Sequence, residues 1–86
     1  MQMKNKVLVE LIVPDIDETF NVFIPVNRKI GNVLVLLVKS VKELSNGMYV
    51  GSEKTALYDR TTGDKYPVNV LVRETNIRNA SKLIMM

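Results

Sequence analysis

The spacing of apolar residues changes along this chain, and that change limits the folds it can adopt. In the first part, apolar residues occupy every second position of KVLVELIVP: Val7, Val9, Leu11 and Val13. After the polar residues DIDE, the segment TFNVFIP alternates in the same way. Two alternating segments joined by a short polar turn predict a β-hairpin. Pro25 closes the hairpin, because proline cannot donate a hydrogen bond to a sheet.

Apolar residues then recur every three or four positions, which predicts one helix with a single apolar stripe. The stripe consists of Ile30, Val33, Leu34, Leu37, Val38, Val41 and Leu44. Val35 and Leu36 widen the apolar arc, as expected for a helix that packs into a concave sheet. Asn27 is the predicted N-cap, and Gly47 is the predicted left-handed stop after the helix.

The second half of the chain predicts shorter elements. The segment GMYVGSEK is interpreted as a flexible connection. TALYDRTTGDKYP indicates a strand, a turn around Gly63 and a short edge segment that Pro67 closes. VNVLVRETNI fits either a strand over residues 68–72 or a loop with a helical turn.

The last segment, KLIMM, is apolar at consecutive positions, which is typical of a central strand covered on both faces. Leu83 and Met85 are expected to face the helix, and Ile84 and Met86 the opposite side. A hairpin, a helix and further strands predict an α+β fold, with one helix packed across one face of a mixed sheet. The first and last strands would lie parallel at the centre of that sheet.

Composition narrows the possible functions. With 86 residues the chain is predicted to be one domain, 1–86, with an ordered core of residues 5–86. It has no Cys and no His, which argues against a hydrolase or a metalloenzyme, and no cofactor is predicted. The net charge of +3 comes from scattered Lys and Arg residues, which indicates a solvated surface. No apolar run is long enough to insert into a membrane, so a cytoplasmic location is expected.

Two segments resemble ubiquitin-like proteins. IPVNRKIGNVLVLL is similar to the family's passage from second strand to helix, with Ile24, Ile30 and Val33 at core positions. VRETNIRNASKLIMM resembles the family's ending, in which an apolar residue, a polar turn and an Asn-Ile pair precede the last strand. The matching residues there are Val72, Asn76, Ile77, Leu83 and Met85. The resemblance implies the β-grasp fold.

The sequence as given departs from ubiquitin at its end, because it lacks the C-terminal Gly-Gly of conjugated modifiers and sulfur carriers. Neither activity is therefore expected. Tail-less ubiquitin-like proteins of this size are typical of the YukD/EsaB family, and this sequence resembles that family. Its members are small cytoplasmic accessory proteins of type VII secretion systems in Gram-positive bacteria. That resemblance implies a non-enzymatic role in binding the secretion machinery or regulating its output.

A β-grasp leaves one sheet face without a helix, and several apolar residues are predicted to lie there. The candidate protein-binding residues are Leu8, Ile12, Phe23, Ile84 and Met86. Phe23 is the expected anchor, because aromatic residues dominate binding hot spots, and Leu57 or Tyr58 could join it. The face could bind a protein partner or a second copy of the chain. Alternatively, the residues are scattered, or the VNVLVRETN segment covers them.

Other functions are less well supported. The acidic residues Asp15, Asp17 and Glu18 fit turn chemistry better than a metal site, because no calcium-loop spacing accompanies them. A small nucleic-acid-associated β-grasp domain is an alternative that requires salt-sensitive binding, and nucleic acid is not the expected partner. An enzyme is a third possibility for which the sequence shows no constellation of catalytic residues.

Overall fold

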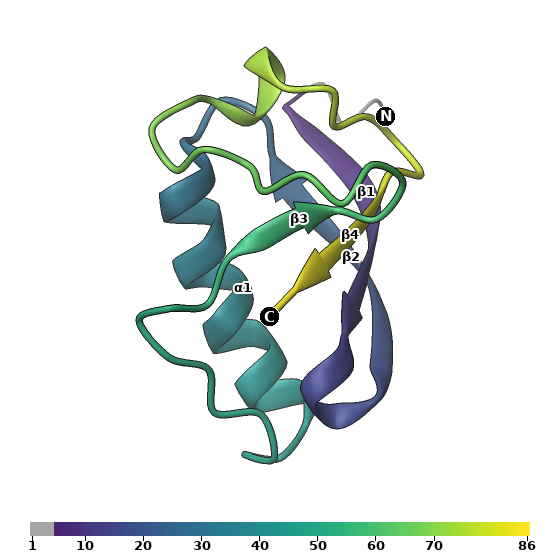
Figure 1. Ribbon diagram of the computed structural model, residues 1–86, viewed down its shortest axis with the longest axis vertical. Coiled ribbons are helices and arrows are strands. Elements are labelled where there is room, and N and C mark those ends of the chain that lie inside the picture. Colours follow the sequence, from purple (N-terminus) through teal and green to yellow (C-terminus); the bar gives the residue numbers. More distant parts are fainter. Residues whose placement is uncertain (1–4) are drawn as a thin grey trace.

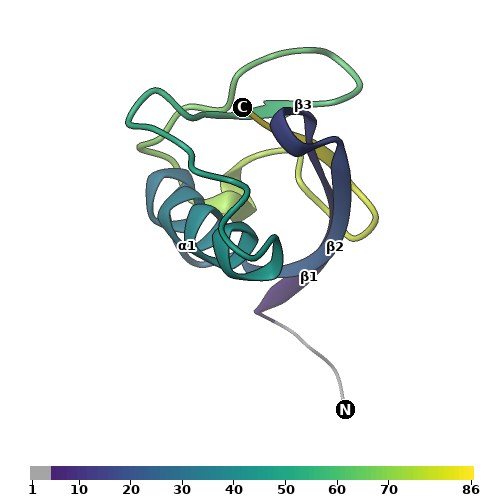
Figure 2. The ribbon, with the colours of Figure 1, turned by 90° about the horizontal axis from the view of Figure 1, so that it is seen from below.

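The computed structural model describes residues 5–86, so residues 1–4 of the predicted domain lie outside the described part. The elements in chain order are β1 (Lys6–Val13), η1 (Pro14–Ile16), β2 (Glu18–Pro25), α1 (Ile30–Leu44), β3 (Leu57–Asp59), η2 (Val72–Glu74) and β4 (Lys82–Met85). The strands form one sheet in the order β2-β1-β4-β3. Strand β1 is parallel to β4, and the other neighbours are antiparallel. Helix α1 lies across the inner side of the curved sheet (Figures 1 and 2). The predicted α+β fold is confirmed.

The first hairpin forms as its alternation predicts. Val9, Leu11 and Val13 are buried, while the even-numbered positions of β1 are exposed or half-buried. At the turn, Asp17 has φ 52°, and its N–H donates to the carbonyl of Pro14 at 3.0 Å. Aspartate tolerates this left-handed conformation better than most residues. The interpretation of this acidic segment as turn chemistry therefore accounts for its geometry.

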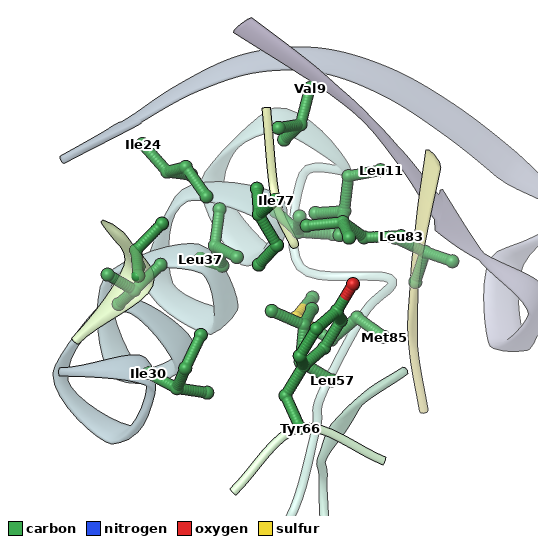
Figure 3. Packing of buried hydrophobic residues seen from close by; sticks show 14 of the residues in the cluster. Val9, Leu11, Ile24, Ile30, Leu37, Leu57, Tyr66, Ile77, Leu83 and Met85 are labelled. Carbon is green, nitrogen blue, oxygen red and sulfur yellow. The ribbon is translucent and has the colours of Figure 1, made fainter. Parts of the chain in front are cut away.

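The last strand occupies the centre of the sheet. Leu83 lies opposite Leu11 in the parallel pair of β4 with β1. Both Leu83 and Met85 are completely buried in the core, where they pack against side chains from β1, β3 and the helix side (Figure 3). Ile84 is half-buried and Met86 is exposed. The predicted burial of Leu83 and Met85 is confirmed, whereas Met86 lies beyond the end of β4.

Helix α1 buries most of its predicted stripe. Ile30, Val33, Leu37 and Val41 are buried. Leu44, by contrast, is more than half exposed, so its prediction as a core residue was wrong. Leu44 is the last residue of α1 and lines a surface groove instead.

The helix N-terminus is capped by main-chain carbonyls and not by Asn27, whose predicted role was wrong. Lys29 is the N-cap, and no side chain makes a capping bond there. The N–H groups of the first two helical residues donate to the carbonyls of Val70 and Val68, at 2.9 and 3.0 Å. Gly31 permits this approach, because a Cβ on it would lie 3.3 Å from the Val68 carbonyl oxygen.

This capping role explains the conformation of residues 68–72, for which the sequence fits either a strand or a loop with a helical turn. Residues 68–72 form a loop followed by the helical turn η2, and their pairing is limited to a single bridge between Leu71 and Lys29. The predicted edge segment before Pro67 is likewise reduced to one bridge between Tyr58 and Lys65. The carbonyls of Val68 and Val70 accept hydrogen bonds from the helix N-terminus and not from a neighbouring strand.

The loop after α1 contributes a core residue that the sequence did not indicate. Tyr49 is almost completely buried in the hydrophobic cluster. Its N–H donates to the Ser45 hydroxyl at 3.0 Å. The Tyr49 hydroxyl is buried and has no hydrogen-bond partner within residues 5–86. The interpretation of GMYVGSEK as a flexible connection was therefore wrong for this residue.

Candidate protein-binding surface

The sheet face opposite α1, here called the open face, carries an exposed apolar pair. Leu8 on β1 lies directly opposite Phe23 on β2. Both side chains are exposed, and Phe23 retains 52% of its accessible surface. Side chains directly opposite each other on neighbouring strands are close enough to contact one partner residue together. The structure therefore brings two of the predicted site residues together.

A second apolar row crosses the open face further along the strands. Ile12 on β1 lies opposite Ile84 on β4, and Ile84 lies opposite Tyr58 on β3. All three are half-buried. Tyr58 thus joins the open face, whereas its neighbour Leu57 is buried in the core. This row is less accessible than the Leu8–Phe23 pair.

A polar row separates the two apolar groups. Glu10 on β1 lies opposite Asn21 on β2 and Lys82 on β4. The predicted residues therefore do not form one continuous patch. Met86 lies at the far end of β4, where its main chain bonds to Ala56, and it lines a groove at the end of the sheet. The 68–72 segment does not cover the open face, because it caps α1.

A hollow of about 540 Å³ lies beside the Leu8–Phe23 pair. Leu8, Asn21 and Lys82 line it together with Asn79 and Ala80 from the loop before β4. The Leu8 N–H donates to Asn79 Oδ1 at 2.9 Å, and the Ala80 N–H donates to the Leu8 carbonyl at 2.8 Å. This loop is thus fixed against β1. Asn79 and Ala80 were missed from the sequence, because nothing in their local pattern places them beside β1.

The Asn-Ile pair of the ubiquitin-like ending holds a polar network. Asn76 Nδ2 donates to Asp59 Oδ2 at 2.8 Å, and the Tyr66 hydroxyl donates to Asn76 Oδ1 at 2.8 Å. The hydrogen bond from Asn76, helped by the Thr61 N–H, lowers the pKa of Asp59. Burial, with a smaller effect of Asp59, raises the pKa of Tyr66 to about 12. Next to this network, Ile77 inserts into the core.

This network fastens the chain before β4 to β3. Its groups are bonded to each other, and each has a structural role in fixing the turn at residues 75–77. Within residues 5–86, no three metal-ligating side chains gather closely enough to hold a metal ion. None of the helices in the described part is long and apolar enough to cross a membrane.

Comparisons with known proteins identify the fold of the chain, but they assign it to no sequence family. No family model matches the chain, and no curated protein matches it. Among solved structures, it is similar to the EccD5 ubiquitin-like domain from Mycobacterium xenopi, with a TM-score of 0.80 and 14% identity over 94% of this chain and 92% of that one. It is also similar to the ubiquitin-like domain of the Mycobacterium tuberculosis type VII secretion protein ECCD1, with a TM-score of 0.72 and 9% identity over 93% and 96% of the two chains.

A third similar structure is a chain of the MycP5-free ESX-5 inner membrane complex, with a TM-score of 0.80 and 15% identity. The match covers 95% of this chain and 21% of that one, so the present chain spans about a fifth of the length of the larger protein. The element order, the sheet topology and these structures agree. The chain has the ubiquitin-like β-grasp fold.

Proposed function

We propose that this chain is a non-catalytic, ubiquitin-like protein-interaction module that serves a type VII secretion system. Two of the similar structures are ubiquitin-like domains of proteins named as EccD, and one of these is named as a type VII secretion protein. The resemblance of the sequence to the YukD/EsaB family supports the finer proposal of a cytoplasmic accessory or regulatory protein in a Gram-positive bacterium. Its partner would be a component of the secretion machinery.

The observation that carries the binding role is the Leu8–Phe23 pair beside its hollow. An aromatic side chain buries about 150–250 Å² when covered. Since about half of Phe23 is exposed, a partner would remove about 100 Å² of apolar surface from water. At 25 cal/mol/Å² this contributes about 2.5 kcal/mol to binding. Phe23 would therefore anchor a partner side chain that enters the adjacent hollow.

The proposal is tested by affinity capture of type VII secretion components from a Gram-positive lysate, identified by mass spectrometry. We expect wild type to recover them and Phe23→Asp to lose them, with both proteins folded by circular dichroism. Val35→Asp is the matched control, because Val35 is an exposed apolar residue on α1 and not on the open face. Equal recovery by Phe23→Asp would show that the partner binds a surface other than the open face. Failure of wild type to recover any secretion component would contradict the secretion role.

The open face could also pair with a second copy of the chain. The exposed Leu8–Phe23 pair is the feature that would mediate such an association. Sedimentation equilibrium at several concentrations tests this directly. A dimer that Phe23→Asp converts to a monomer would support self-association, whereas a wild-type monomer at every concentration would exclude it under those conditions.

One feature favours the alternative of a nucleic-acid-associated domain. The fold brings Lys6, Arg28, Lys29 and Arg73 to the end of the molecule where α1 begins, since the main chain of residues 72–73 bonds to Arg28 and Val26. These basic residues are exposed, and Phe23 is the one exposed aromatic residue near them among the described residues, since Pro25 of the same strand lies opposite Lys6. A single aromatic side chain offers base stacking for one base only. Salt-sensitive binding of a short RNA, lost in Arg73→Glu, would favour this alternative over the secretion role.

A further inference from the structure

A second apolar surface lies at the opposite end of the molecule, where α1 ends. It is here called the apolar base, and it consists of Ile16, Leu44, Met48, Val50 and Met86. Met48 and Val50 are the two most exposed large apolar side chains of the described residues, at 74% and 71%. In Figure 1 this end carries the first hairpin turn and the loop that follows α1. Exposed apolar side chains that cluster in this way are typical of an interaction site.

The loop holds these side chains outward for a structural reason. Tyr49 is buried in the core and holds the loop in place, whereas its neighbours Met48 and Val50 are exposed. The loop is also pressed against α1, since a Cβ on Gly51 would lie 3.1 Å from Val38 Cγ1. Gly51 has φ 69°, which a side chain would disfavour. The apolar base is therefore positioned by the fold.

Two adjoining grooves run across the apolar base. One, of about 340 Å³, lies between the hairpin turn and the loop at residues 48–55, and Met86 closes one side. The other, of about 290 Å³, lies between the hairpin and the end of α1, with Phe20 and Leu44 in its wall. Ile16 and Met48 line both grooves. Together they can accept more than one apolar side chain from a single partner.

The rim of the apolar base is acidic, although the whole chain has a net charge of +3. Asp15, Asp17 and Glu18 lie in the hairpin turn, and Glu53 lies in the loop, whereas Lys54 is the basic residue that lines the groove. In the last turn of α1, Lys42 and Glu43 add one charge of each sign, so five negative charges and two positive charges give this end of the molecule a net charge of −3. The C-terminal end of α1 adds about half a negative charge, from the helix dipole.

We propose that the apolar base binds a basic amphipathic segment of a partner protein. The apolar side of the segment would enter the two grooves, and its Lys or Arg residues would contact the acidic rim. Methionine suits this role because its unbranched, polarizable side chain adapts to partners of different shape. Helical segments with one apolar side commonly bind such grooves. This surface is separate from the open face and can be occupied at the same time.

The same charges argue against other occupants. A second copy placed base to base would bring two surfaces of net charge −3 together, which is unfavourable. Nucleic acids and anionic membranes would be repelled in the same way. A neutral apolar segment would gain nothing from the acidic rim. A cationic amphipathic segment is therefore the occupant that satisfies both the grooves and the rim.

The test uses the full chain and a synthetic Leu/Lys peptide of about 14 residues, which forms about 20 Å of helix with Leu on one side. Methyl-labelled methionine reports binding by NMR. We expect the methyl signals of Met48 and Met86 to shift, whereas Met85, which is completely buried, serves as an internal control. A Leu/Lys peptide of the same composition in scrambled order, and a Leu/Glu peptide, are expected to bind at least about tenfold more weakly.

Matched variants localise the interaction. Met48→Lys and Val50→Lys are expected to weaken binding of the Leu/Lys peptide by about tenfold or more. Val35→Lys makes the same charge change at a valine that is 69% exposed on α1, and it is expected to leave binding within about twofold. All three replace exposed side chains, so the fold is expected to persist by circular dichroism.

Several outcomes would overturn the proposal. Equal losses in Val50→Lys and Val35→Lys would show a nonspecific charge effect. Unshifted Met48 and Met86 signals would place the peptide elsewhere. Equal binding of the Leu/Glu peptide would show that the acidic rim does not select the partner. Self-association of wild type that Val50→Lys abolishes would make a second copy the occupant.

Discussion

The two buried tyrosines of this protein provide a test of its core, because they differ in what their hydroxyl groups contact. The Tyr49 hydroxyl is buried without a hydrogen-bond partner among the described residues. The Tyr66 hydroxyl donates to Asn76 Oδ1 at 2.8 Å. Replacing each tyrosine with phenylalanine removes one oxygen atom and leaves the ring in place. The same chemical change should therefore have opposite effects on stability at the two positions.

Burial of a polar group without a partner costs about 1–3 kcal/mol. Tyr49→Phe removes that cost, and we expect an increase in the free energy of unfolding of about 1 kcal/mol. Tyr66→Phe removes a hydrogen bond, which contributes about 0.5–1.5 kcal/mol, so the free energy of unfolding should fall by that amount. For a domain of this size, 1 kcal/mol corresponds to a change of about 4–8 °C in Tm.

Urea unfolding followed by circular dichroism measures both variants beside wild type. If Tyr49→Phe is clearly less stable than wild type, the hydroxyl is bonded in solution and the reasoning fails. Alkaline pH gives a second test of Tyr66. Since its pKa is raised to about 12 in the folded protein, folding favours the protonated hydroxyl. The free energy of unfolding should fall as the pH rises from 10.0, the ordinary pKa of tyrosine, toward about 12, the pKa of Tyr66 in the folded protein. Tyr66→Phe should reduce this loss.

Three further predictions concern the core, the polar network and the helix start. Leu83→Ala should lower the free energy of unfolding by about 2–5 kcal/mol, because it leaves a cavity at the centre of the sheet; a loss below about 1 kcal/mol in urea would contradict this packing. Hydrogen bonding lowers the pKa of Asp59 in the folded protein below its ordinary value of 3.8. The charged carboxylate therefore stabilises the fold above pH 3.8, and this stabilisation is lost as the pH falls through the lower pKa of the folded state. Asp59→Asn should weaken this acid dependence in unfolding curves measured between neutral pH and pH 2, and an unchanged profile would exclude the contribution. Gly31→Val should lower Tm, because the Cβ alone meets the Val68 carbonyl oxygen at 3.3 Å; an unchanged Tm would show that the capping segment moves away freely.

Local sequence pattern was sufficient to predict the core-facing residues of an element when one face of that element is buried. The alternation of β1 correctly placed Val9 and Leu11 in the core, and the last strand followed the same rule at Leu83 and Met85. These predictions succeeded because removing apolar surface from water decides which side of a strand faces inward, and the side-chain spacing of a strand is regular. The order of the elements then restricted the fold to one helix on one mixed sheet.

Local pattern failed where the decisive partner is distant in the chain. Asn27 was a reasonable N-cap by residue type, yet carbonyls of residues 68–70 perform the capping. Tyr49 lies in a loop without periodicity, so nothing local indicated that it enters the core. The candidate site was predicted by parity alone, which places Leu8, Phe23 and Ile84 on one face but does not show that Glu10 and its neighbours divide them.

The sequence by itself thus determined which side of β1 and of β4 faces the core and that one helix covers one sheet, because burial and spacing are properties of each regular segment. Only the tertiary structure decided which exposed residues lie together. The apolar base joins Ile16, Met48 and Met86 from three distant segments, and acidic residues of the hairpin turn line the same grooves in a chain of positive net charge. Surface chemistry of this kind depends on distances between segments, and those distances exist only after the helix and the sheet have packed.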